Sequence, residues 1–201
     1  MSSIVIAGNT SGAITIAAPA EAGLNTLTLP ASTGTVALTS DIPAPVTAVQ
    51  THLTTTSSQS ITANTRANIS GLNATITPST TSKRIKITIR WNGEHSNSSN
   101  QNQVFGIKRD TTDIGNPAAA GSRSVGMAIV AQGFSAYDAD STPDSATYTY
   151  IDSPATTSAT TYHATFMQRT TGTLYNQRTV ADSNAAGYER LTSNIILEEI
   201  D

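Results

Sequence analysis

One segment of this chain specifies its own secondary structure: Arg84-Ile85-Lys86-Ile87-Thr88-Ile89-Arg90-Trp91. Its apolar and polar residues alternate strictly. Side chains of a β-strand point to opposite faces with a period of two, so one face of this segment is apolar and the other is mostly charged. Isoleucine and tryptophan suit a strand that packs one face on a core. We therefore predict that residues 84–91 form the central strand of an antiparallel β-sandwich, with Trp91 as a core anchor.

The composition favours an all-β fold and excludes several classes of partner. The chain has 201 residues, 12% of them charged, and a formal net charge of -3. The charged share is about half the usual value of roughly 25%, and neutral polar residues take its place. Because the chain carries no excess of positive charge, we expect no nucleic-acid partner. Because it has no long apolar run, we expect no membrane insertion. The absence of cysteine excludes disulfides and thiolate metal sites.

Residues 54–201 predict one sandwich, jelly-roll-like in architecture. Further segments alternate in the same way, namely residues 61–69, 72–76, 104–107, 146–150, 162–166, 174–180 and 195–200. The inward parity changes across Ser70-Gly71, which predicts a β-bulge or a tight turn there. Residues 125–134 predict a buried strand. Short strands separated by polar connections are typical of a sandwich or jelly roll.

Residues 1–42 predict short strands separated by turns. Ile4 alternates with Ile6, and Ile14 alternates with Ile16. With few large side chains, this segment cannot bury enough apolar surface to offset the entropy of ordering the chain. Two interpretations remain open here: a loosely ordered arm, or strands that complete a sheet only with other copies of the chain or with a docking partner.

Residues 43–53 predict a linker or a short neck between the two parts. Two prolines near its start favour an extended backbone. Val46, Val49 and Leu53 have a spacing that places them on one stripe of a helix, as in a neck around a threefold axis. The three threonines that follow disfavour a helix. A helical neck and an extended linker or first strand both remain open.

The N-terminal segment also resembles a known module. Residues 11–23 read Ser-Gly-Ala-Ile-Thr-Ile-Ala-Ala-Pro-Ala-Glu-Ala-Gly, and Leu24-Asn25-Thr26-Leu27-Thr28-Leu29-Pro30 and residues 31–41 follow. The ordered pattern over residues 11–41 is similar to an N-terminal module common in tail-fibre and other structural proteins of tailed bacteriophages. The resemblance implies attachment to the virion through residues 1–42.

A second resemblance covers the C-terminal part. It is carried by residues 83–92, 107–115, 121–123, 150–157, Tyr162 and 195–200. In this order they are similar to the C-terminal domain at the ends of many phage fibre-like proteins, which is generally a trimeric β-sandwich head. The resemblance implies a homotrimer. Its motifs are structural, so it implies a fold and no particular binding residues.

Three polar connections are the candidates for binding a receptor, namely residues 92–103, 111–124 and 137–145. Binding residues concentrate on loops that a rigid scaffold holds, and amides and hydroxyls suit hydrogen bonding to sugars. The individual candidates are His95, Asn97, Asn100, Tyr137, Asp138 and Asp140. Asp138 and Asp140 also suit Ca²⁺, but their spacing does not match the twelve-residue calcium loop, so we expect no metal.

The sequence predicts no catalytic site. His52, His95 and His163 are far apart and lack the spacing of metal ligands. The sequence has no nucleophile elbow, phosphate-binding loop or dinucleotide fingerprint. We therefore expect no enzyme activity and no cofactor.

Together these patterns predict a virion structural protein. The first expectation is a trimeric tail fibre that docks on other virion proteins through residues 1–42. Its C-terminal sandwich would then bind a glycan or protein on the host surface. The alternative is a capsid decoration or head-fibre protein that binds and stabilises the shell. The two share the predicted fold and the N-terminal anchor.

Overall fold

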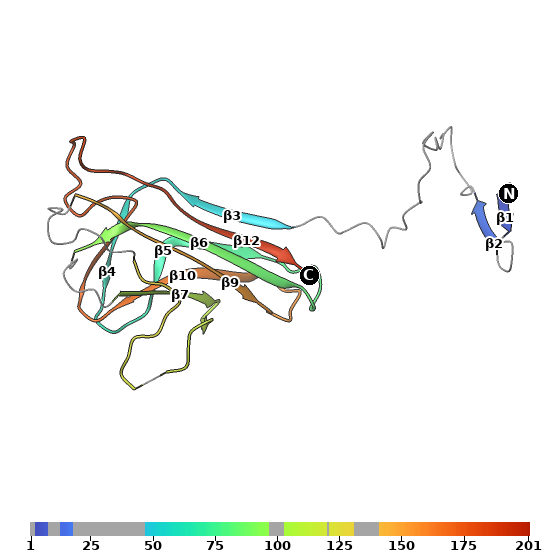
Figure 1. Ribbon diagram of the computed structural model, residues 1–201, viewed down its shortest axis with the longest axis horizontal. Helices are drawn as coiled ribbons and strands as arrows, with labels where there is room; N and C mark the ends of the chain where they lie inside the picture. The colour runs from blue at the N-terminus through green and yellow to red at the C-terminus, as the bar shows by residue number, and fades with distance from the viewer. Residues whose placement is uncertain (1–2, 8–12, 18–46, 97–102, 120, 131–140) are drawn as a thin grey trace. The chain divides into compact units, whose positions relative to one another are not determined.

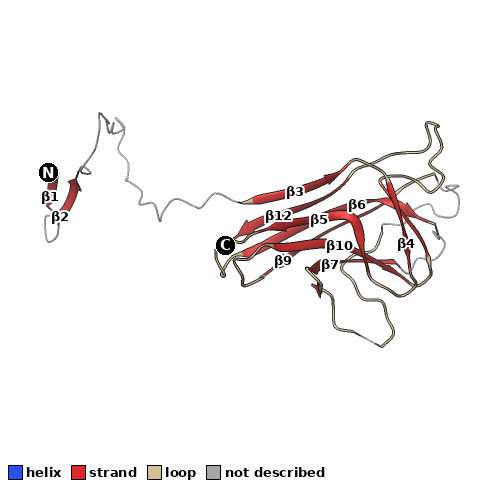
Figure 2. Cartoon of the chain, turned by 180° about the vertical axis from the view of Figure 1, so that it is seen from behind, coloured by secondary structure: helices blue, strands red, loops and turns tan. Residues whose placement is uncertain are grey.

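The computed structural model describes residues 3–7, 13–17, 47–96, 103–119, 121–130 and 141–201. The chain forms two units, Met1–Ala44 and Pro45–Asp201. Within the described residues, all regular elements are β-strands (Figure 2). The prediction of an all-β protein is confirmed for this part of the chain.

The first unit contains an antiparallel hairpin. It consists of β1 (Ser3–Ala7) and β2 (Ala13–Ala17), and Ile4 pairs with Ile16 across it. Both strands lie where the alternation of isoleucines predicted them.

The described residues of the second unit form ten strands in two antiparallel sheets (Figure 1). The strands are β3 (Ala48–Leu53), β4 (Ser57–Ile61), β5 (Ala67–Ile76), β6 (Arg84–His95), β7 (Gln103–Arg109), β8 (Thr112–Ile114), β9 (Asp144–Asp152), β10 (Thr160–Gln168), β11 (Gly172–Asn176) and β12 (Ser193–Ile200). The six-stranded sheet has the order β3-β12-β6-β11-β4, with β9 paired to β6, and the four-stranded sheet has the order β5-β10-β7-β8.

Strand β6 is the centre of the six-stranded sheet, as predicted. Residues 84–90 pair with β12 on one side, and residues 85–93 pair with β9. Beyond the end of the β12 pairing, residues 93–95 pair with β11 instead. Strand β6 therefore pairs with three neighbouring strands, β9, β11 and β12.

The core lies between the two sheets. Ile85, Ile87 and Ile89 are 0% exposed, which confirms the inward parity predicted for them. The Trp91 ring lies 4.9 Å from the ring of Phe105 in β7, centroid to centroid. Trp91 is 1% exposed, and its indole N–H donates a hydrogen bond of 2.8 Å to the side-chain oxygen of Asn176. Trp91 is thus a core anchor that joins the sheets and also has a satisfied polar group.

Strand β6 continues four residues past the predicted end, and both of its faces are then covered. The inward parity persists through His95, whereas Glu94 points to the opposite face. That face is covered by the segment after β11, because the backbone N–H of Val180 donates to a Glu94 carboxylate oxygen at 2.6 Å. The simple alternation of buried and exposed residues therefore ends at Trp91 although the strand does not.

The predicted bulge lies in β5. The partners of β10 jump from Asn73, opposite His163, to Asn68, opposite Thr165. Gly71, between them, has a φ of +75°, a backbone conformation that disfavours side chains with a Cβ. The extra residues on β5 explain why Ile69 and Leu72 are both buried although their parities differ.

Residues 48–53 form a strand and not a helical neck. This strand, β3, pairs with β12 through residues 48–53 and lies at the edge of the six-stranded sheet. Val49 and Leu53 are partly buried and pack against the core. Their apolar spacing fits alternate positions of a half-buried strand equally well. Val46 lies outside the described residues.

The prediction of a buried strand at residues 125–134 is wrong for residues 125–130. Their pairing with β7 is limited to one isolated β-bridge, between Phe105 and Ala128. The Ile129 side chain is 68% exposed. The segment lies very close to β7, since a Cβ on Gly126 would lie 2.7 Å from the carbonyl oxygen of Phe105. The glycine that weakens a strand is thus needed for this close approach. Residues 131–134 lie outside the described part of the chain.

A buried carboxylate ties the two sheets together. Asp152, at the end of β9, accepts hydrogen bonds from the Arg109 guanidinium at 3.0 and 3.2 Å. It also accepts one from the Tyr162 hydroxyl at 2.8 Å. Burial raises the pKa of Tyr162, so this hydroxyl stays protonated and donates. Arg109 and Tyr162 belong to the four-stranded sheet, so the network joins both layers.

Candidate functional site

The sandwich has two distinct ends. At the proximal end, which we define by the start of β3, Ala48 pairs with Glu198 and Arg84 pairs with Ile200. At the distal end, where β6 finishes and β7 starts, Gln103 pairs with Gln168. The described part of the sandwich therefore begins at its proximal end, with Thr47 and β3.

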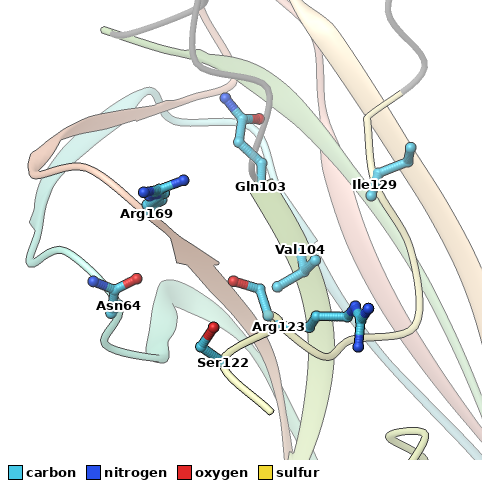
Figure 3. Close-up of a pocket in the computed structure, with 8 residues that line it drawn as sticks. Asn64, Gln103, Val104, Ser122, Arg123, Ile129 and Arg169 are labelled. Carbon is cyan, nitrogen blue, oxygen red and sulfur yellow. The ribbon is translucent and has the colours of Figure 1, made fainter. Parts of the chain in front are cut away.

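A cavity of about 800 Å³ lies at the distal end. It is lined by Asn64, Gln103, Val104, Ser122, Arg123, Ser124, Ile129 and Arg169 (Figure 3). These residues come from the β4–β5 turn, the start of β7, the connection between β8 and β9, and the residue after β10. Loops meeting at one end of a β-sandwich are a common position for a binding surface.

Backbone pairing brings these segments together. Gln103 and Gln168 are opposite each other in the four-stranded sheet, so β7 begins where β10 ends. The backbone N–H of Asn64 donates to the carbonyl oxygen of Gln168 at 2.7 Å. Asn64 has a φ of +56°, which asparagine tolerates better than most residues. The turn before β5 is thereby held against the end of β10.

Arg66 fixes the connection that forms one wall of the cavity. Its side chain is 8% exposed, and it contacts Asp113 at 3.5 Å between nitrogen and oxygen. Its guanidinium donates to the Thr165 hydroxyl at 3.0 Å and to the carbonyl oxygen of Val125. A Cβ on Gly106 would lie 2.4 Å from that guanidinium, so glycine leaves the room it occupies. Arg66 thus holds Asp113 and Val125, at the two ends of this connection, beside the four-stranded sheet.

The lining combines cationic, neutral polar and apolar groups. Arg169 and Arg123 are both exposed, and none of the eight lining residues is acidic. In Figure 3 the Arg169 guanidinium lies on the side of Asn64, whereas the Arg123 guanidinium lies on the side of Ile129. The two cations are therefore separated across the cavity. This arrangement can bind a polar molecule with an acidic group.

The structure tests only part of the predicted receptor surface. Five of the predicted residues lie outside the described part of the chain: Asn97, Asn100, Tyr137, Asp138 and Asp140. His95 is described, and its place in the core contradicts a role in direct surface contact. It is 1% exposed, and its ring stacks on Phe166 with centroids 5.7 Å apart. Its polarity suggested a loop, but it occupies the next inward position of β6 after Trp91 and the glycine that follows.

Sequence reasoning covered only part of the cavity. The predicted connections included Gln103 and residues 122–124. Asn64, Val104 and Ile129 were not predicted as binding residues, because they lie inside segments that the sequence predicted as strands. Arg169 was not predicted either, because its only signal was a position shortly after a predicted strand. Their proximity depends on the order of strands in the sheets, which alternation does not define.

The buried His95 predicts a pH dependence of stability. Burial lowers the pKa of His95 from 6.5 to about 4. Between these values the unfolded chain binds a proton that the folded protein does not, so the free energy of unfolding falls as the pH is lowered. We expect this residue alone to cost about 2 kcal/mol between pH 7 and pH 5.

Urea unfolding at several pH values measures this effect. The His95→Gln variant should show a flatter profile between pH 7 and pH 5 than the unmodified protein. A His95→Gln profile as steep as that of the unmodified protein would contradict the assignment.

Comparison with known proteins finds no matching family model and no match among curated proteins. Within the described residues, no group of three or more histidine or acidic side chains is placed to hold a metal ion. No helix in the same part of the chain is long and apolar enough to cross a membrane. The distal cavity is therefore the candidate binding site of this protein.

Proposed function

We propose that this protein is a trimeric tail fibre of a tailed bacteriophage, a virion structural protein that adheres to the host surface. In this proposal residues 1–42 attach to other virion proteins, and three jelly-roll-like sandwiches form the head. The distal end of each sandwich binds a glycan or protein of the host cell.

The observation that carries the proposal is the separation of the two ends of the sandwich. The chain arrives at the proximal end, beside Ala48, and the cavity is at the distal end, beside Gln103. An adhesive head needs this polarity, since its binding surface must face away from its attachment. The resemblance of residues 11–41 to a phage attachment module is independent support. Weak contacts repeated over three copies raise the avidity without a single strong site.

The test is to remove the N-terminal unit. A protein consisting of Pro45–Asp201 keeps all ten strands of the sandwich and the core between them. We expect it to fold, to remain trimeric by light scattering, and to bind host cells, yet to be missing from assembled virions. The full chain, produced in parallel, should be incorporated.

A graft provides the complementary control. Residues 1–42 joined to an unrelated trimeric head should bring that head into virions. Incorporation of the truncated protein would place attachment in the sandwich, and the capsid decoration protein would then replace the tail fibre. Cells that bind neither the full chain nor the truncated protein would contradict an adhesive function.

A further inference from the structure

The cationic side of the distal cavity sets the first requirement for a ligand. Arg169 is exposed beside Asn64 and forms no ion pair within the part of the chain that the structure covers. A guanidinium offers a planar set of donors that matches a carboxylate or a phosphate. The chain as a whole has a formal net charge of -3, whereas the described residues that line this cavity include two arginines and no acidic residue.

The remaining groups match the body of a sugar. Asn64 supplies a carboxamide and Ser122 a hydroxyl, and both can donate to and accept from sugar hydroxyls. Val104 and Ile129 supply an apolar surface, and Ile129 is 68% exposed. An exposed isoleucine at the rim of a polar cavity suits the C–H face of a sugar ring.

We propose that the distal cavity binds a saccharide bearing an acidic group, with Arg169 contacting the acid and Asn64 and Ser122 forming hydrogen bonds with its hydroxyls. This inference rests on the proposed adhesive function and names the chemical class of its receptor. The acid is a carboxylate or a phosphate, because a guanidinium fits both.

The experiment is calorimetric titration of the full chain with matched pairs of probes. Trigalacturonate is compared with neutral maltotriose, and mannose 6-phosphate with mannose; inorganic phosphate is the probe for a simple anion site. We expect at least one acidic sugar to bind more tightly than its neutral partner, and the pair that shows the difference identifies the acid. Binding should weaken as salt is added.

Two charge-matched variants locate the contact. Arg169→Gln should weaken binding of the acidic sugar by roughly tenfold or more, because a charge-assisted hydrogen bond is lost. Arg90→Gln removes the same charge from an exposed position on β6, outside the cavity, and should leave the affinity unchanged. Both arginines are exposed, so neither variant is expected to impair folding.

Each other outcome overturns the proposal. Equal binding of acidic and neutral sugars would remove the acid from the ligand. Inorganic phosphate binding as tightly as the sugars would indicate a simple anion site, and no binding by any probe would mean that the cavity is not a saccharide site. Equal losses in the two arginine variants would indicate a general charge effect.

The failure of this inference is distinguishable from the failure of the adhesive function. Host-cell binding by the full chain tests adhesion, and it does not depend on which probe binds. If Arg169→Gln left host-cell binding intact while the full chain bound no acidic sugar, adhesion would stand and the acidic receptor would be rejected.

Discussion

Replacing Trp91 by alanine is expected to lower the free energy of unfolding by about 3–5 kcal/mol. The ring is 1% exposed and lies 4.9 Å from Phe105 of the opposite sheet, so its loss leaves a cavity between the layers. It also leaves the side-chain oxygen of Asn176 without its buried donor. Urea unfolding of both proteins at the same protein concentration measures the difference.

Two further variants separate the contributions at this position. Trp91→Phe keeps an aromatic ring against Phe105 and removes the indole N–H, so it should cost less than the alanine variant. Ile151→Ala, at a residue that is 45% exposed on β9, should cost well under 1 kcal/mol. A loss of less than 1 kcal/mol for Trp91→Ala would contradict the parity of β6.

Replacing Asp152 by alanine is expected to lower the free energy of unfolding by about 3 kcal/mol. The change removes a carboxylate that is 7% exposed. It leaves the Tyr162 hydroxyl, buried between the sheets, without its acceptor at 2.8 Å. Arg109 loses its ion pair as well, and its side chain is 30% exposed, so water offsets part of that loss.

The matched control is Glu198→Ala. Glu198 also forms an ion pair, with Lys86, but those two side chains are 33% and 41% exposed. Exposed ion pairs contribute about 0–1 kcal/mol, so this variant should be nearly neutral. Equal effects of the two carboxylate variants in urea unfolding would show that the network around Asp152 is no stronger than a surface pair.

Alternation predicted most of the strands because it reports burial directly. Residues 85–91 of β6 have the predicted parity, and so do Tyr162 and Phe166 of β10. The bulge in β5 was also predictable, because an inserted residue shifts the inward parity and glycine tolerates the backbone conformation that the insertion requires.

The errors have a common physical origin. His95 follows the parity of β6, but its polar side chain resembled a loop residue, because the sequence does not reveal that the segment around Val180 covers this end of the strand. Residues 125–130 are apolar enough for a strand, yet the close contact between Gly126 and β7 leaves room for only an isolated bridge. Both errors arise from packing between segments that are far apart in the sequence.

The position of β3 has a mechanical consequence. If the distal end is held by a cell and the chain is pulled at Thr47, tension passes into β3 along its own axis. The hydrogen bonds between β3 and β12 run perpendicular to the strands, and residues 48–53 all pair with β12. The load is therefore shared in shear by the whole strand at once, and the bonds do not open one after another as in peeling. An edge strand that is weak in isolation becomes resistant to force in the direction from which a tether would apply it.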